Sequence, residues 1–176
     1  MVAELRGVRR RNFAASEIVA MAMAPGRGGA GDSYTVWDQQ RRRGDCVSDI
    51  WNEMLEAARR VQRPREISER VYAGGVAAAI ESASGRIYTG VCVDTSCTLG
   101  ICAERNAIFN MITNGEGEIR RVLALMPDGT TAAPCGACRE LMAQLMPGRY
   151  QDVEVIVDYA EGKVMTLGEL TPEWWL

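Results

Sequence analysis

The sequence predicts an α/β fold in which helices cover both faces of a central sheet. The first observation is periodicity: from Asp45 onward, apolar residues recur with helical spacing in some segments and form short strand-like runs in others. The second is order, because these helices and strands alternate along the chain, as they do in layered α/β domains. The third is size, since 176 residues, of which 47% are hydrophobic, can bury a proper core.

The first 44 residues differ in composition from the rest. Residues 1–44 hold eight arginines and four acidic residues, a formal charge of +4, whereas the whole chain carries −3. The glycine-rich run 25–31 is typical of a flexible linker. Three arginines at 9–11 before a short apolar run faintly resemble a targeting peptide, but Glu17 breaks that pattern. We therefore expect a basic, flexible extension over 1–44 and one folded domain over 45–176.

The first expected element is a helix from about Asp45, its expected N-cap, to Val61, with Pro64 ending the segment. Its apolar residues recur at steps of three and four, and they are Val47, Ile50, Trp51, Met54, Leu55 and Ala58. Such a face most simply packs on a sheet, so Trp51 is interpreted as a core residue.

The following elements alternate between strand and helix. Strands over 71–80 and 86–93 are expected to form a hairpin, although the alanine run 77–79 disfavours a strand on propensity alone. A loop over 94–100 leads to a helix that stops near Asn114 and whose apolar face comprises Ala107, Ile108, Met111 and Ile112. A strand over 121–126, a helix with Cys138, Leu141, Met142 and Leu145 on one face, and strands over 153–157 and 163–166 complete the domain.

Three cysteines and one carboxylate occur at the starts of two of these helices. Cys135 and Cys138 are spaced i, i+3 and can reach one metal from one helix face, while Cys102 and Glu104 begin the other helix. Two helix N-termini facing the metal would stabilise a three-thiolate zinc, which carries net negative charge. Three protein ligands leave a fourth position for water, as hydrolytic zinc sites require. The sequence therefore predicts one catalytic zinc.

The chain has no histidine, which leaves Glu104 as the expected proton carrier beside the metal. Two other interpretations of the cysteines remain open. Cys92 or Cys97 could supply a fourth thiolate and close a structural zinc site, or the Cys-x-x-Cys could be a redox pair.

Cys102-Ala103-Glu104, followed about thirty residues later by Pro134-Cys135-x-x-Cys138, resembles the cytidine deaminase family in its all-cysteine, homotetrameric branch. The resemblance extends from about Cys46 to Trp175. It implies a three-layer α/β/α fold with a central mixed sheet of about five strands. It also implies that the three cysteines bind zinc, that Glu104 is the general acid/base, and that Arg105 hydrogen-bonds the thiolates. Ala103 and Cys135 would offer backbone groups to the base.

The expected substrate contacts depart from the family pattern. Cytidine-specific members have Asn-x-Glu on the second strand for the ribose, where this sequence has Cys92-Val93-Asp94. Cys92 cannot replace the hydrogen bonds of an amide, and Asp94 is one methylene shorter than glutamate. The C-terminal Trp174 and Trp175 resemble the end of blasticidin S deaminase, where an aromatic residue reaches an active site. Their alternative role is to cover a helix or a subunit surface.

Three functions follow. The leading one is zinc-dependent hydrolytic deamination of a cytosine-ring nucleoside, the second is deamination of an aminonucleoside antibiotic of the blasticidin S type, and the third is a non-catalytic, zinc-stabilised binding protein. We expect a homotetramer, with a dimer as the alternative, and a cytoplasmic location, because thiolate ligands fit a reducing compartment. The mild acidity and the absence of a long apolar run give no support for nucleic-acid or membrane partners.

Overall fold

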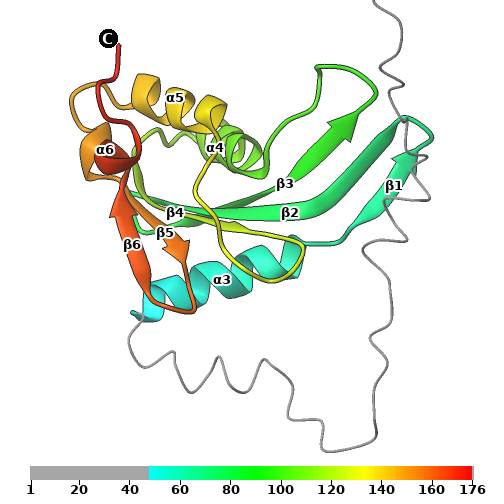
Figure 1. Ribbon diagram of the computed structural model, residues 1–176, viewed down its shortest axis with the longest axis horizontal. Helices are drawn as coiled ribbons and strands as arrows, with labels where there is room; N and C mark the ends of the chain where they lie inside the picture. The colour runs from blue at the N-terminus through cyan, green and yellow to red at the C-terminus, as the bar shows by residue number, and fades with distance from the viewer. Residues whose placement is uncertain (1–47, 176) are drawn as a thin grey trace, which may run out of the picture. The chain divides into compact units, whose positions relative to one another are not determined.

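The structure is a computed structural model that describes residues 48–175, so the basic segment 1–44 and Asp45 lie outside the described residues. Figure 1 shows helices on either side of one sheet. The elements are α3 (Asp49–Val61), β1 (Arg65–Ser68), β2 (Val71–Ser82), β3 (Ile87–Thr95), α4 (Ala103–Thr113), β4 (Ile119–Leu125), α5 (Gly136–Leu145), the 3-10 turn η2 (Tyr150–Asp152), β5 (Glu154–Asp158), β6 (Lys163–Thr166) and α6 (Leu167–Leu170).

The six strands form one mixed sheet in the order β1-β2-β4-β5-β6, with β3 paired to β2. Only β4 and β5 run parallel, and the other pairs are antiparallel. The five expected strands are present, and the expected mixed sheet is confirmed with one strand more. That sixth strand, β1, has four exposed residues and therefore shows none of the alternation that marks a half-buried strand.

Two apolar clusters, one on each face of the sheet, confirm the three layers. On one face α3 packs through Trp51, Met54, Leu55 and Ala58 on side chains of β2, β4 and β5. On the other face α4 and α5 pack on the remaining core residues of β2, β3 and β4. The alanines of β2 that disfavoured a strand on propensity are fully buried between these layers, where small side chains let both helices approach closely.

Gly90 of β3 fixes the position of α4. A Cβ at this residue would lie 2.3 Å from the backbone nitrogen of Ala107 and 2.7 Å from the backbone oxygen of Ala103, so only glycine allows the helix to come this close. Two amides on α4 then bind carbonyls of β3: Asn106 Nδ2 donates to Val91 O at 2.9 Å, and Asn110 Nδ2 donates to Thr89 O at 3.1 Å. The N-terminus of α4 is thereby held against the sheet.

Two details differ from the sequence predictions. The first helix begins at Asp49 with Ser48 at its N-cap, whereas a start at Asp45 was expected. Ile112, assigned to the buried face of α4, is 43% exposed, because the face that meets the sheet includes Ala103 and Glu104 instead.

Within residues 48–175, no helix combines the length and apolarity that a membrane span requires.

Candidate active site

The three predicted zinc ligands lie together at the starts of two helices. Cys102 is the N-cap of α4 and Cys135 the N-cap of α5, and Cys138 follows in the first turn of α5. The Sγ atom of Cys135 lies 3.5 Å from that of Cys102 and 3.4 Å from that of Cys138, and all three Sγ atoms lie within 4.8 Å of one another. Three soft ligand atoms converging from two helix N-termini suit a single zinc ion.

The two cysteines considered as a fourth ligand do not join this group in the described part of the chain. The Sγ atom of Cys92 instead accepts a hydrogen bond from the backbone N–H of Val76 at 3.1 Å. Cys97 is exposed in the turn after β3, where Thr95 contacts it. The set therefore holds three thiols, and this arrangement favours an open position on the metal over a closed four-thiolate site.

The thiols influence one another strongly. Burial, and then hydrogen bonding to Cys135, raises the pKa of Cys102, and burial together with the negative charge of Glu104 raises the pKa of Cys138. Desolvation would also raise the pKa of Cys135, but hydrogen bonds from backbone N–H groups at the start of α5 and from the thiols of Cys138 and Cys102 together outweigh it and lower its pKa. Three thiolates this close together need a cation among them, which a metal ion provides.

Arg105 fits the expected partner of these thiolates. Burial alone would lower the pKa of its guanidinium, but Cys102 and Cys138 raise it through hydrogen bonding and charge. Its buried Nε has no hydrogen-bond partner among the described residues. An unpartnered buried donor is costly, and a neighbouring cysteine thiolate is an acceptor that could satisfy it. The donor set thus fits a metal-thiolate centre.

Glu104 lies in the first turn of α4 and is only 6% exposed. It follows the N-cap Cys102 by two residues at the end of α4 where the thiols converge, and its negative charge contributes to raising the pKa of Cys138. Glu104 is not among the three residues whose ligand atoms converge. A buried carboxylate next to a metal site, but outside the ligand set, has the position that a proton carrier needs.

The predicted substrate residues occupy two places. Ala103 is fully buried at the start of α4, and Cys92 packs on the same core cluster as Cys102. Asp94 is exposed on β3, opposite Tyr72 of β2, and its carboxylate lies 3.8 Å from the Cys92 sulphur. Cys92 and Asp94 therefore both lie on β3, the strand against which α4 packs.

Both C-terminal indoles are bound to α5. Trp174 Nε1 donates to Glu140 Oε2 at 2.9 Å, and Trp175 Nε1 donates to Glu140 Oε1 at 3.1 Å. Trp174 packs at the edge of Tyr150, with ring centroids 5.0 Å apart, while Trp175 is 70% exposed. Trp174 thus covers a helix, and a role of either indole at an active site stays a prediction. Glu140 was not singled out from the sequence, because nothing in its spacing marks it.

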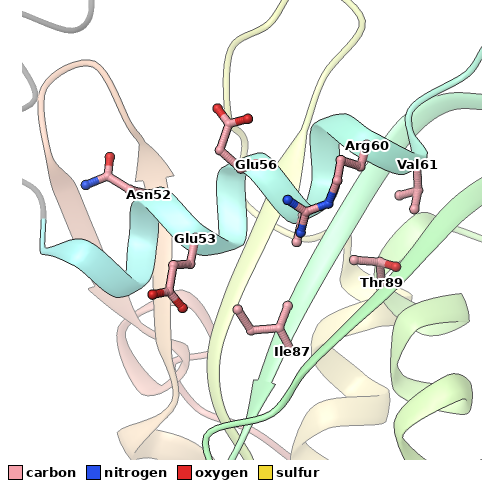
Figure 2. A pocket seen from close by; sticks show the side chains of 8 residues that line it. Asn52, Glu53, Glu56, Arg60, Val61, Ile87 and Thr89 are labelled. Atoms are coloured by element: carbon pink, nitrogen blue, oxygen red, sulfur yellow. The ribbon is translucent and has the colours of Figure 1, made fainter.

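A cavity of about 620 Å³ lies elsewhere, between α3 and β3. Figure 2 shows Glu53 and Arg60 of α3 and Ile87 and Thr89 of β3 along its lining. Because α3 covers the face of the sheet opposite α4 and α5, this cavity is separate from the cysteine group.

The chain was compared with known families and structures. Residues 52–152 match the family described as the cytidine and deoxycytidylate deaminase zinc-binding region. A cytidine deaminase of Halalkalibacterium halodurans is 31% identical over 100 residues, which cover 55% of this chain and 74% of the relative.

Solved structures show the same fold. A cytidine deaminase of Burkholderia pseudomallei is 27% identical with a TM-score of 0.54, covering 70% of this chain and 98% of that one. A cytidine deaminase of Mycobacterium leprae is 25% identical with a TM-score of 0.57 and the same coverage. The chain belongs to the zinc-binding cytidine and deoxycytidylate deaminase family.

Proposed function

We propose that this protein is a zinc-dependent hydrolytic deaminase that converts a cytosine-ring nucleoside to its uracil form and releases ammonia. The observation that carries the proposal is the convergence of three cysteine sulphurs within 4.8 Å, with the buried carboxylate of Glu104 beside them. Membership of the deaminase family supports hydrolysis of a cytosine amine as the reaction.

Cys102, Cys135 and Cys138 would hold the zinc, and Arg105 would stabilise their negative charge. When bound at such a site, zinc activates water for nucleophilic attack near neutral pH. The N-termini of α4 and α5 add the positive ends of two helix dipoles, which favour an anionic metal-thiolate centre.

Glu104 is the proposed general acid/base. It takes a proton from the attacking water and passes it to the ring nitrogen beside C4, so that the new C–O bond forms without charge building up on the ring. It then transfers the second proton of the water to the amino group, and the C–N bond breaks to release ammonia. One water is consumed for each ammonia formed. No histidine is present to share this task.

Substrate contacts are proposed from the strand and helix next to the thiols. The backbone of Ala103 would contact the base, and Asp94, exposed on β3, would accept hydrogen bonds from sugar hydroxyls, with Cys92 filling the position of the amide in cytidine-specific members. Such contacts favour a nucleoside over a free base.

We also propose that the working enzyme is a homotetramer in the cytoplasm. Phe109 and Ile112 are large apolar side chains, 45% and 43% exposed, on the outer side of α4, and Trp175 adds a third on the C-terminal segment. Phe109 and Ile112 lie three residues apart on one helix, and neighbouring exposed apolar side chains favour association with further copies. Cysteines that must stay reduced to bind metal fit a reducing compartment, and all five described cysteines are free.

The proposal is tested by ammonia release from zinc-loaded protein on cytidine, deoxycytidine, cytosine, dCMP and blasticidin S in parallel. Turnover of cytidine or deoxycytidine, but not of cytosine, supports the nucleoside assignment and a role for Asp94. Turnover confined to blasticidin S would replace the substrate class and direct attention to Trp174 and Trp175. No turnover by protein that holds one zinc per chain would contradict the enzymatic proposal and favour a zinc-stabilised binding protein.

A further inference from the structure

The C-terminal segment, residues 167–175, is held to α5 by two consecutive side chains of that helix. Arg139 Nη1 donates to the backbone oxygen of Leu170 at 2.7 Å. The carboxylate of the next residue, Glu140, accepts from the indole nitrogens of both Trp174 and Trp175. The segment is therefore bound by its backbone and by its side chains to the helix that carries two of the three cysteines.

The same guanidinium makes a second hydrogen bond inside the cysteine loop. Arg139 Nε donates to the backbone oxygen of Pro134 at 2.7 Å. Pro134 is buried and immediately precedes Cys135, whose own backbone oxygen already accepts the N–H groups of Cys138 and Arg139 at the start of α5. One side chain thus connects the carbonyl before Cys135 to the carbonyl that ends α6.

The far end of this connection is fixed in the core. Leu167 is fully buried, and its N–H donates to the backbone oxygen of Val153 at 2.7 Å. Thr166 and Glu169 close a capping box at the start of α6. Because α6 cannot move without breaking these contacts, the Leu170 carbonyl is a rigid anchor for Arg139.

We propose that the C-terminal segment braces the metal centre, with Arg139 as the positioning residue that fixes the backbone at Pro134 and so holds Cys135 in place. This inference rests on the proposed zinc site. Cys135 is exposed while Cys138 is fully buried, so Cys135 is the ligand that we expect to dissociate from the metal first. A hydrogen bond to the preceding carbonyl restricts that movement, and its loss should shorten the lifetime of bound zinc.

The experiment measures zinc release from the full chain to a chromogenic chelator, at a temperature well below unfolding. Arg139→Gln removes the double-ended bridge, and Glu140→Ala releases both indoles while leaving Arg139 in place. We expect zinc to leave Arg139→Gln about tenfold faster, the effect of losing one charge-assisted hydrogen bond, and to leave Glu140→Ala faster by a smaller factor. Arg139→Lys has one ammonium group in place of the forked guanidinium, so its rate of zinc release should fall between those of Arg139→Gln and the unmodified protein.

Two control variants separate positioning from a general loss of stability. Ile156→Val trims a buried side chain on the opposite face of the sheet and should lower the melting temperature without changing zinc release. Arg149→Gln removes an exposed arginine that pairs with Glu118 and tests for a charge effect alone. The thiolate-to-metal absorption of the Co²⁺-loaded protein reports ligand geometry directly, and Arg139→Gln should shift it.

An unchanged rate of zinc release together with an unchanged Co²⁺ spectrum in Arg139→Gln would overturn the proposed positioning role of Arg139. Equally fast release from Ile156→Val at the same loss of melting temperature would overturn it as well. If Arg139→Gln does not fold, the comparison of Arg139→Lys with Ile156→Val decides in the same way. If the unmodified protein binds no zinc, the proposed metal site fails and the brace with it, which is a different result from a normal site with unchanged release.

Discussion

Gly90 on β3 faces the backbone of α4, so replacing it with alanine should displace the helix that carries Cys102 and Glu104. The new Cβ would lie 2.3 Å from the Ala107 nitrogen, whereas ordinary contact begins at 3.4 Å, so the helix must move outward by about 1 Å. The three nearest atoms, on Ala107, Ala103 and Asn106, all belong to the backbone and not to a flexible side chain. Overpacking of this kind costs about 1–3 kcal/mol, which corresponds to a fall in melting temperature of roughly 4–12 °C.

The same movement should affect turnover more than stability. A displacement of about 1 Å at a catalytic group lowers rates by about a hundredfold, and both Glu104 and the Cys102 ligand move with α4. Calorimetry of Gly90→Ala gives the melting temperature, and ammonia release gives the rate. Gly117→Ala is the matched control, because its Cβ would meet nothing within 4 Å. A Gly90→Ala variant with the stability and turnover of Gly117→Ala would refute this account of how α4 is positioned.

Three further predictions concern charge and metal. Arg121→Met should destabilise the fold by about 3 kcal/mol in denaturant unfolding, because it removes the closer partner of the buried Glu81 carboxylate, at 2.7 Å, and leaves only the longer pair with Arg120 at 3.9 Å; the double variant with Glu81→Leu should recover most of the loss, and no recovery would contradict this pairing. Hydrogen bonds from Ser82 and Tyr88 hold the pKa of Glu116 below its ordinary value of 4.5, so its stabilisation is complete above that value and is lost as the pH falls through the lowered pKa. The melting-temperature difference between unmodified protein and Glu116→Gln should therefore shrink from pH 7 to pH 3, and a constant difference would exclude the titration. Removing zinc with a chelator should lower stability by about 2.7 kcal/mol relative to protein at a hundredfold excess of zinc over its dissociation constant, and an unchanged melting temperature would argue against a bound metal.

Much of the fold followed from local patterns. The apolar face of α3 was read from Trp51, Met54 and Leu55, because a helix that packs on a sheet repeats its buried residues every three or four positions. The three metal-binding cysteines could be predicted for a similar reason. Cys135 and Cys138 share one helix face, and two cysteines at this spacing indicate a metal site. These features depend on neighbours in the sequence, so the sequence records them.

Features that depend on distant partners were not readable. The short strand β1 consists of four exposed residues, and it exists because the first part of β2 offers free backbone groups for pairing. Ile112 was placed on the wrong face, since the direction of α4 is set by Gly90 on another element. Glu140 holds both C-terminal indoles across a separation of 34 and 35 residues, which no local pattern encodes.

The most direct test of the central claim compares the unmodified protein with Glu104→Ala, using Glu118→Ala as a control that removes an exposed glutamate. Zinc content and ammonia release from cytidine and deoxycytidine are measured on the same samples. We predict one zinc per chain in all three proteins, normal turnover in Glu118→Ala, and a loss of at least about a hundredfold in Glu104→Ala, the contribution typical of a general acid/base. Turnover by Glu104→Ala close to that of the unmodified protein would contradict the role of Glu104 and with it the proposed mechanism.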